Sequence, residues 1–168
     1  MKIIIRAIRQ EDAQLISDAF ARIGWHKPVS QYRRYLSEQR SKKRAVLVAW
    51  VGPTFVGYLT ILWKSGYASF RRGRVPEIMD LNVLPQFRRS GIGTKLMDRA
   101  EAMIKRHSAL AGIGVGLAPG YNTAQRMYVK RGYVPDGLGV TYDGKFVRDG
   151  QSVEVNDDLV FHLTKKLT

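Results

Sequence analysis

The chain has 168 residues, 45% of them hydrophobic and none of them cysteine, and a net charge of +14 from 28 basic against 14 acidic residues. This composition predicts one compact domain over residues 1–168, and it excludes disulfides, thiolate metal sites and a cysteine nucleophile. The charge favours phosphate-rich partners. The apolar stretch at the N-terminus is too short and too soon charged for a signal sequence, and no apolar run could span a membrane, so we expect a cytoplasmic protein with no membrane partner. No metal is expected either.

Apolar patterning in the first half of the chain predicts four strands and two helices. The predicted strands are residues 3–7, 45–51, 55–63 and 78–84, and the predicted helices are residues 12–23 and 30–38. Ser30 is the expected N-cap of the second helix. The turn signal Gly52-Pro53-Thr54 predicts a hairpin between the second and third strands, and the arginine-rich residues 65–74 are expected to form a connection.

The second half continues the mixed pattern. A helix is predicted where apolar residues recur at helical spacing, namely Leu96, Met97, Ala100, Met103 and Ile104. A strand is predicted at residues 111–117, a helix at 122–130, one interrupted strand over 133–142 and a last strand at 159–163. The order of elements is that of a mixed α/β domain.

The most informative stretch joins the fourth predicted strand to the helix that follows it. Pro85 ends the strand, and a basic turn containing Gly91 and Gly93 leads into the helix. The first backbone N–H groups of a helix lack intrahelical acceptors, and the helix dipole adds partial positive charge there. Glycine removes the side chains that would keep an anion away from the backbone. The turn therefore predicts a bound phosphate or pyrophosphate, although an ordinary turn before a helix is the plain alternative.

The glycine spacing excludes two common phosphate motifs. Residues 91–95 lack the order of a P-loop, and Leu96 stands where a dinucleotide fold needs its third glycine. The turn resembles the acyl-CoA signature of the GNAT N-acyltransferase superfamily, in which Gln or Arg is followed by two residues, Gly, one residue, and Gly or Ala. Arg88, Gly91 and Gly93 fill those places.

A second landmark lies at residues 122–133, where a predicted helix ends at Gly132 before an aromatic residue. This segment resembles the GNAT helix that has Asn and Ala near its start and Tyr within it. Tyr128 matches that pattern. Asn122 departs from it, because it precedes Ala124 by two residues where the family more often has three. A half-buried packing role is the alternative for Tyr128.

The resemblance implies a central, mostly antiparallel sheet with a splayed parallel pair, flanked by about four helices. It also implies acetyl-CoA as co-substrate, with the pantetheine arm against the backbone of the fourth strand and the pyrophosphate on the turn. By resemblance, the cofactor-binding residues are Leu81, Asn82, Val83, Arg88, Arg89, Ser90, Gly91, Ile92, Gly93, Thr94, Asn122 and Tyr128.

The chemistry implied is transfer of an acetyl group to a primary amine. A free alkyl amine has a pKa of about 10, so a base is expected to remove its proton, and the departing thiolate benefits from a donor. Tyr128 is the predicted acid. Glu77 is the first candidate base and Asp80 the second, while a salt-bridged or solvated carboxylate is the alternative for both. Without cysteine, direct transfer in a ternary complex is favoured.

Two other functions remain open at this stage: a non-catalytic acyl-CoA sensor and a basic nucleic-acid-binding module, although no nucleic-acid motif is recognisable. The acceptor is not identified, and a homodimer is expected only by analogy. Aromatic and basic residues in the expected acceptor region fit either a pocket wall or ordinary packing. These are Trp25, Tyr32, Trp63, Tyr67, Phe70, Tyr142, Arg71, Arg72 and Arg74.

Overall fold

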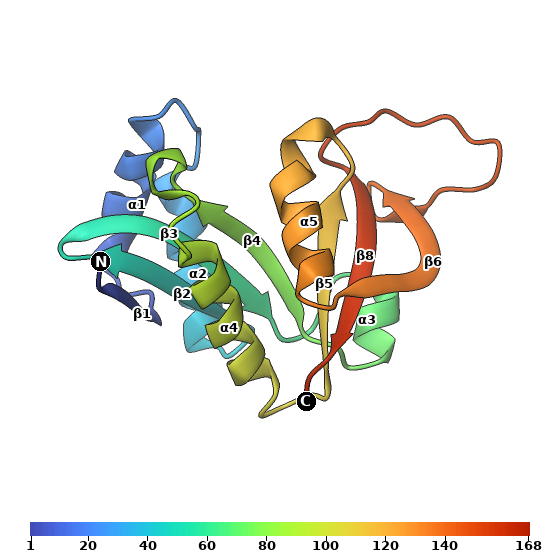
Figure 1. Cartoon of the computed structure of the whole chain (residues 1–168), viewed down its shortest axis with the longest axis horizontal. Coiled ribbons are helices and arrows are strands. Elements are labelled where there is room, and N and C mark those ends of the chain that lie inside the picture. The colour runs from blue at the N-terminus through green and yellow to red at the C-terminus, as the bar shows by residue number, and fades with distance from the viewer. The chain divides into compact units, whose positions relative to one another are not determined.

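The computed structural model describes residues 1–168 and divides the chain into two compact units (Figure 1). One unit comprises Met1–Trp63 with Ile78–Met103, and the other comprises Lys64–Glu77 with Ile104–Thr168. None of the helices combines the length and the apolar character that crossing a lipid bilayer requires.

The first unit contains most of the N-terminal elements. They are β1 (Ile3–Ala7), α1 (Asp12–Ala21), α2 (Val29–Arg40), β2 (Arg44–Val51), β3 (Thr54–Leu62), β4 (Glu77–Val83), a 3₁₀ turn (Pro85–Phe87) and α4 (Ile92–Ile104). The first residue of β4 and the last residue of α4 belong to the second unit. The strands lie in the order β1-β2-β3-β4. Strands β2 and β3 pair antiparallel, with Val48 opposite Tyr58.

The core of this unit lies between its sheet and helices α1 and α2. Nearly every residue of β2 and β3 is buried, which is the pattern of strands covered on both faces. Phe20 of α1, Tyr32 of α2 and Tyr58 of β3 are fully buried in one apolar cluster. Their rings meet edge to face, with centroids 5.9 Å apart for Phe20–Tyr58 and 5.5 Å apart for Tyr32–Tyr58.

Gly57 of β3 is needed for the close approach of β4. A Cβ atom at this position would lie 2.7 Å from the backbone oxygen of Asn82 and 3.2 Å from the Cα of Val83. We expect Gly57→Ala to lower the free energy of unfolding by about 2 to 3 kcal/mol, because backbone atoms cannot move aside cheaply. Gly66→Ala is the control, since its Cβ would meet nothing within 4 Å. Urea unfolding compares the two variants, and equal stability would contradict the close approach.

The second unit is built on an antiparallel ribbon. Its elements are α3 (Ala68–Arg72), β5 (Leu110–Gly116), a 3₁₀ turn (Pro119–Tyr121), α5 (Asn122–Lys130), β6 (Val134–Tyr142), β7 (Lys145–Phe146) and β8 (Leu159–Lys166). The strand order is β5-β8-β6-β7. Ile113 of β5 lies opposite Leu163 of β8. The ladder between β6 and β8 is irregular between Pro135 and Val140, where the sequence predicted an interrupted strand.

The predicted mixed α/β class and the mostly antiparallel sheet are confirmed. One local prediction is wrong, and two short elements were not predicted. Helix α2 begins at Val29 with Pro28 at the cap position, because an extended proline pre-sets the helix start, so Ser30 lies inside the helix. The connection at residues 65–74 contains α3, whose Phe70 is buried. The short strand β7 had no periodic signal and was not predicted.

Candidate functional site

The turn after β4 has the backbone conformation of an anion cradle. A short 3₁₀ helix at Pro85–Phe87 follows the strand, and α4 begins at Ile92. Between them, Arg89 and Gly91 have positive φ values of 59° and 80°. Positive φ is costly for most residues, so glycine suits position 91. The Ser90 hydroxyl donates to the Phe87 carbonyl and closes the turn.

The amides at the start of α4 are available to a ligand. The N–H of Lys95 donates to the Gly91 carbonyl at 3.0 Å, which is the first intrahelical bond. The N–H groups of Ile92, Gly93 and Thr94 come before the first N–H that donates within the helix, so they have no intrahelical acceptor. A Cβ atom at Gly91 would meet nothing within 4 Å, so open space lies above the turn. Amides without intrahelical acceptors, next to glycines, fit a pyrophosphate.

Arg88 is exposed, yet part of its guanidinium is already engaged. Its Nε donates to the Val83 carbonyl at 3.2 Å, and its Cζ lies 5.6 Å from the ring centroid of Trp25. Both contacts hold the side chain over the end of β4. Arg89 is exposed next to it. Arg88 thus contributes positive charge close to the end of the strand.

Strand β4 is irregular where the pantetheine arm is expected. Asp80 has a φ of 54°, an uncommon value for a residue other than glycine, and this interrupts the regular alternation of the strand. Asn82 donates from Nδ2 to Asp80 Oδ1 at 2.7 Å. Leu81, Asn82 and Val83 are half-buried.

The carboxylate of Asp80 is the centre of a polar cluster inside the first unit. Tyr58 of β3 donates its hydroxyl to Oδ2, and Tyr35 and Gln31 of α2 donate to the same oxygen at 3.0 and 3.1 Å. Lys27 Nζ lies 3.3 Å from Oδ1. Sequence reasoning did not find these partners of Asp80. The one local signal was the four-residue spacing of Gln31 and Tyr35, which puts both on one face of a helix.

Burial and the neighbouring Asp80 charge raise the pKa of Tyr35 to about 12. In the unfolded chain the phenol ionises near pH 10. Between these values the unfolded state has released a proton that the folded state keeps, so stability is complete below pH 10 and falls as pH rises toward 12. We expect Tyr35→Phe to lose less stability than the wild type between pH 8 and pH 11, measured by urea unfolding. If the stability of both proteins falls equally with pH, Tyr35 does not cause this loss of stability.

Glu77, at the start of β4, is buried with 6% exposure. The Ser65 hydroxyl donates to its Oε2 at 2.5 Å, and the same hydroxyl oxygen accepts the N–H of Tyr67 at 2.9 Å. Glu77 and both of its partners belong to the second unit. Glu77 is therefore a structured, hydrogen-bonded carboxylate with little access to solvent.

Tyr128 and Asn122 lie on α5 in the second unit. Tyr128 is 6% exposed, and burial, together with nearby Tyr121, raises the pKa of its phenol well above 10. Asn122 is exposed at the first position of the helix, where its Oδ1 accepts the N–H of Thr123. Gln125, which the sequence did not single out, donates from Nε2 to the Gly116 carbonyl at 2.8 Å and ties α5 to the end of β5.

The aromatic residues expected near an acceptor are largely used in packing. Tyr32 is fully buried in the core of the first unit. In the second unit, Tyr67 stacks on His162 with centroids 3.6 Å apart, and Phe70 meets the same imidazole edge to face. The Tyr67 hydroxyl donates to Asp136 Oδ2 at 2.7 Å. These contacts favour the packing interpretation of Tyr32, Tyr67 and Phe70.

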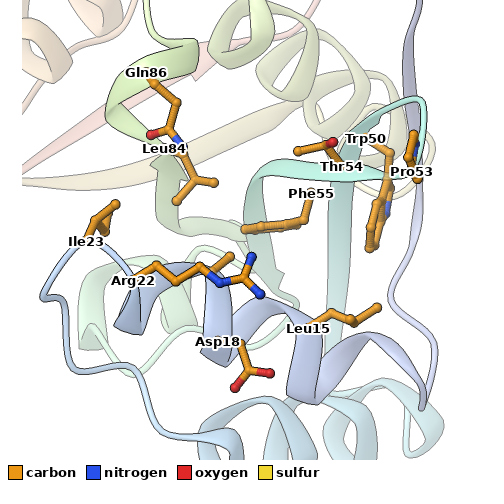
Figure 2. Close-up of a pocket in the computed structure, with 11 residues that line it drawn as sticks. Leu15, Asp18, Arg22, Ile23, Trp50, Pro53, Thr54, Phe55, Leu84 and Gln86 are labelled. Atoms are coloured by element: carbon orange, nitrogen blue, oxygen red, sulfur yellow. The ribbon is translucent and has the colours of Figure 1, made fainter.

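A separate cavity of about 250 Å³ lies in the first unit between α1, the β2–β3 hairpin and the end of β4 (Figure 2). Its walls are mostly apolar. In Figure 2 the guanidinium of Arg22 extends toward the middle of the cavity, across from Phe55 and Trp50, while Leu84 and Gln86 enter from the segment after β4. None of the predicted catalytic residues lines it.

The model of the acetyltransferase (GNAT) family matches residues 10–133 of the chain. The match includes the turn after β4 and α5. The chain belongs to the GNAT acetyltransferase family. A curated relative of this GNAT protein, described as an uncharacterized N-acetyltransferase from Archaeoglobus fulgidus, is 36% identical over 89 residues. Those residues are 52% of this chain and 58% of that relative, so the chain spans little more than half of the relative's length.

Solved GNAT structures share the fold at low identity. An acetyltransferase of the family from Desulfovibrio desulfuricans has a TM-score of 0.73 at 16% identity, over 99% of this chain and 100% of its own. An acetyltransferase from Salmonella typhimurium, solved with its cofactor acetyl-CoA, gives 0.72 at 16%, over 100% and 95%. A spermidine N-acetyltransferase from Vibrio cholerae with CoA and spermine gives 0.69 at 14%, over 98% and 95%. At identities this low, the structural similarity establishes only the fold of this GNAT protein and not its substrate.

Proposed function

We propose that the protein is an N-acetyltransferase that moves an acetyl group from acetyl-CoA to a primary amine by direct transfer in a ternary complex. The turn after β4 carries this proposal. Its amides at Ile92, Gly93 and Thr94, which lack intrahelical acceptors, and the open space at Gly91 suit a pyrophosphate. Family membership supports the same co-substrate.

The proposed cofactor-binding roles involve the turn after β4, β4 itself and α5. The amides of Arg89 through Thr94 hold the pyrophosphate, and Arg88 adds charge. The backbone of β4 from Val83 back to Leu81 holds the pantetheine arm, and Asn122 on α5 contributes a weaker cofactor contact. Acetyl-CoA supplies a thioester whose carbonyl carbon accepts the amine nitrogen and whose sulfur departs as a thiolate. Tyr128 is proposed to donate a hydrogen bond to that sulfur.

Glu77 and Asp80 are the two proposed bases for the amine. The base must take a proton from the ammonium form, directly or through water. The side chain of Asp80 is 22% exposed, whereas Glu77 is 6% exposed and bound to Ser65. Exposure therefore supports Asp80 as the carboxylate that meets an acceptor.

The test uses the purified full chain, acetyl-CoA and a panel of amines. We expect calorimetry to detect acetyl-CoA binding and a thiol-reactive dye to detect release of CoA with at least one amine class. If the protein binds acetyl-CoA but releases no CoA with any amine, the result would favour the non-catalytic acyl-CoA sensor. Absence of both, with salt-sensitive DNA or RNA binding that CoA does not affect, would favour the nucleic-acid module.

A further inference from the structure

Lys27 is the one charged donor among the groups that surround the Asp80 carboxylate. Its Nζ lies 3.3 Å from Asp80 Oδ1 and 3.3 Å from the Tyr58 hydroxyl oxygen. The same nitrogen lies 5.4 Å from the centroid of the Phe20 ring and 5.8 Å from that of Tyr58. A carboxylate combined with two aromatic rings attracts an ammonium ion. We call Asp80, Tyr58 and Phe20 the ammonium seat.

The two rings of the seat are fully buried, whereas its present occupant is partly exposed. Phe20 and Tyr58 are fully buried, and Tyr35 of α2 fixes the orientation of the carboxylate. Lys27 instead lies in the loop between α1 and α2, and its side chain is 20% exposed. Ser17 donates its hydroxyl to the Lys27 carbonyl at 2.8 Å and so holds the backbone of that loop residue.

Space for a second position of the lysine side chain is present. Lys27 lines a surface hollow of about 330 Å³. The hollow is also lined by Ser17 of α1 and by Gly24, Trp25 and Pro28 of the loop that follows α1. A lysine side chain that left the seat would find space in this hollow.

We propose that the ammonium seat binds the amine acceptor, a primary ammonium at the end of an unbranched alkyl chain, and that Lys27 fills this seat until the acceptor displaces it. The inference rests on the proposed function, because a pantetheine arm that runs from the turn back along Val83 to Leu81 brings its thioester end toward Asp80. The class of acceptor follows from the occupant, since a lysine side chain is itself such an amine. The strained backbone at Asp80 is in keeping with a functional position.

Competition by Lys27 is tested with Lys27→Met, which keeps the length of the side chain and removes its charge. If Lys27 fills the seat about nine-tenths of the time, its removal raises the apparent affinity for an acceptor about tenfold. We expect butylammonium chloride to bind Lys27→Met about tenfold more tightly than wild type, as measured by protein-observed NMR without acetyl-CoA. Lys27→Arg keeps the positive charge and should resemble wild type. Lys43→Met, at an exposed lysine before β2, is the control.

The seat itself is tested in the Lys27→Met background. Asparagine adopts a positive φ as readily as aspartate, so Asp80→Asn keeps the backbone and removes the charge. We expect it to weaken butylammonium binding by more than about tenfold. Neutral butanol should not distinguish any of the variants. Equal butylammonium affinity in wild type and Lys27→Met, or in Lys27→Met with and without Asp80→Asn, would overturn the proposal.

The same variants separate this inference from the enzymatic one. With saturating acetyl-CoA, Lys27→Met should lower the KM for butylamine about tenfold and leave the affinity for acetyl-CoA unchanged. If wild type neither binds acetyl-CoA nor releases CoA, the proposed function fails, and the NMR titrations still decide whether Lys27 occupies an ammonium site. If CoA is released and the KM is the same in both proteins, the acceptor binds elsewhere and the present inference fails alone.

Discussion

Replacing Gly91 with aspartate is expected to weaken acetyl-CoA binding by about 100-fold, or about 3 kcal/mol. Gly91 precedes α4 at a φ of 80°, with open space where a Cβ would stand. Aspartate tolerates this conformation better than most residues, and its negative charge suits a helix N-terminus. The carboxylate would meet the amides at the start of α4 and repel the pyrophosphate, while the fold remains intact.

Gly91→Asn is the matched control, because it has the same shape without the charge. We expect it to lose about tenfold or less in affinity, since only the backbone strain and the added bulk remain. Calorimetric titration with acetyl-CoA measures binding, and thermal unfolding checks that both variants are folded. Wild-type affinity in Gly91→Asp would show that the phosphates bind elsewhere.

Tyr128→Phe is expected to reduce kcat by about 100-fold while the KM for acetyl-CoA changes by less than about twofold. Burial raises the pKa of Tyr128 well above 10, so the phenol stays protonated at neutral and mildly alkaline pH. A thiol has a pKa of about 8.5, so complete proton transfer from this phenol to a thiolate is unfavourable. The hydroxyl is therefore proposed to act as a hydrogen-bond donor, rather than as a full acid, whose contribution would grow as charge develops on sulfur.

Tyr133→Phe provides the control for Tyr128→Phe. Tyr133 is also buried, with its ring centroid 6.1 Å from that of Tyr128, so its substitution disturbs the same region. We expect its kcat to stay within about twofold of wild type, because the Tyr133 hydroxyl has no proposed part in the chemistry. Steady-state rates of CoA release compare the two. Equal rates in Tyr128→Phe and wild type would remove Tyr128 from the chemistry and leave it a packing residue.

Several features followed from the sequence because their causes are local. Helix α5 was predicted at its observed bounds of Asn122–Lys130, since apolar spacing and Gly132 define both ends. The turn after β4 was predicted for the same reason: glycine at a positive φ and the amides of a helix start depend on a few consecutive residues. Local reasoning was less successful at the start of α2, where a proline rather than a serine occupies the cap.

By itself, the sequence determined the mixed α/β pattern, the glycine turn with its helix and the candidate residues Asp80 and Tyr128. Only the tertiary structure decided what surrounds Asp80. Lys27 and Tyr58 are 53 and 22 positions away from it in the chain, and they meet its carboxylate because α1, α2, β3 and β4 pack around one core. Periodicity reports which face of an element is buried, but it does not report which distant side chain lies against that face, since that depends on how all the elements fill the same interior.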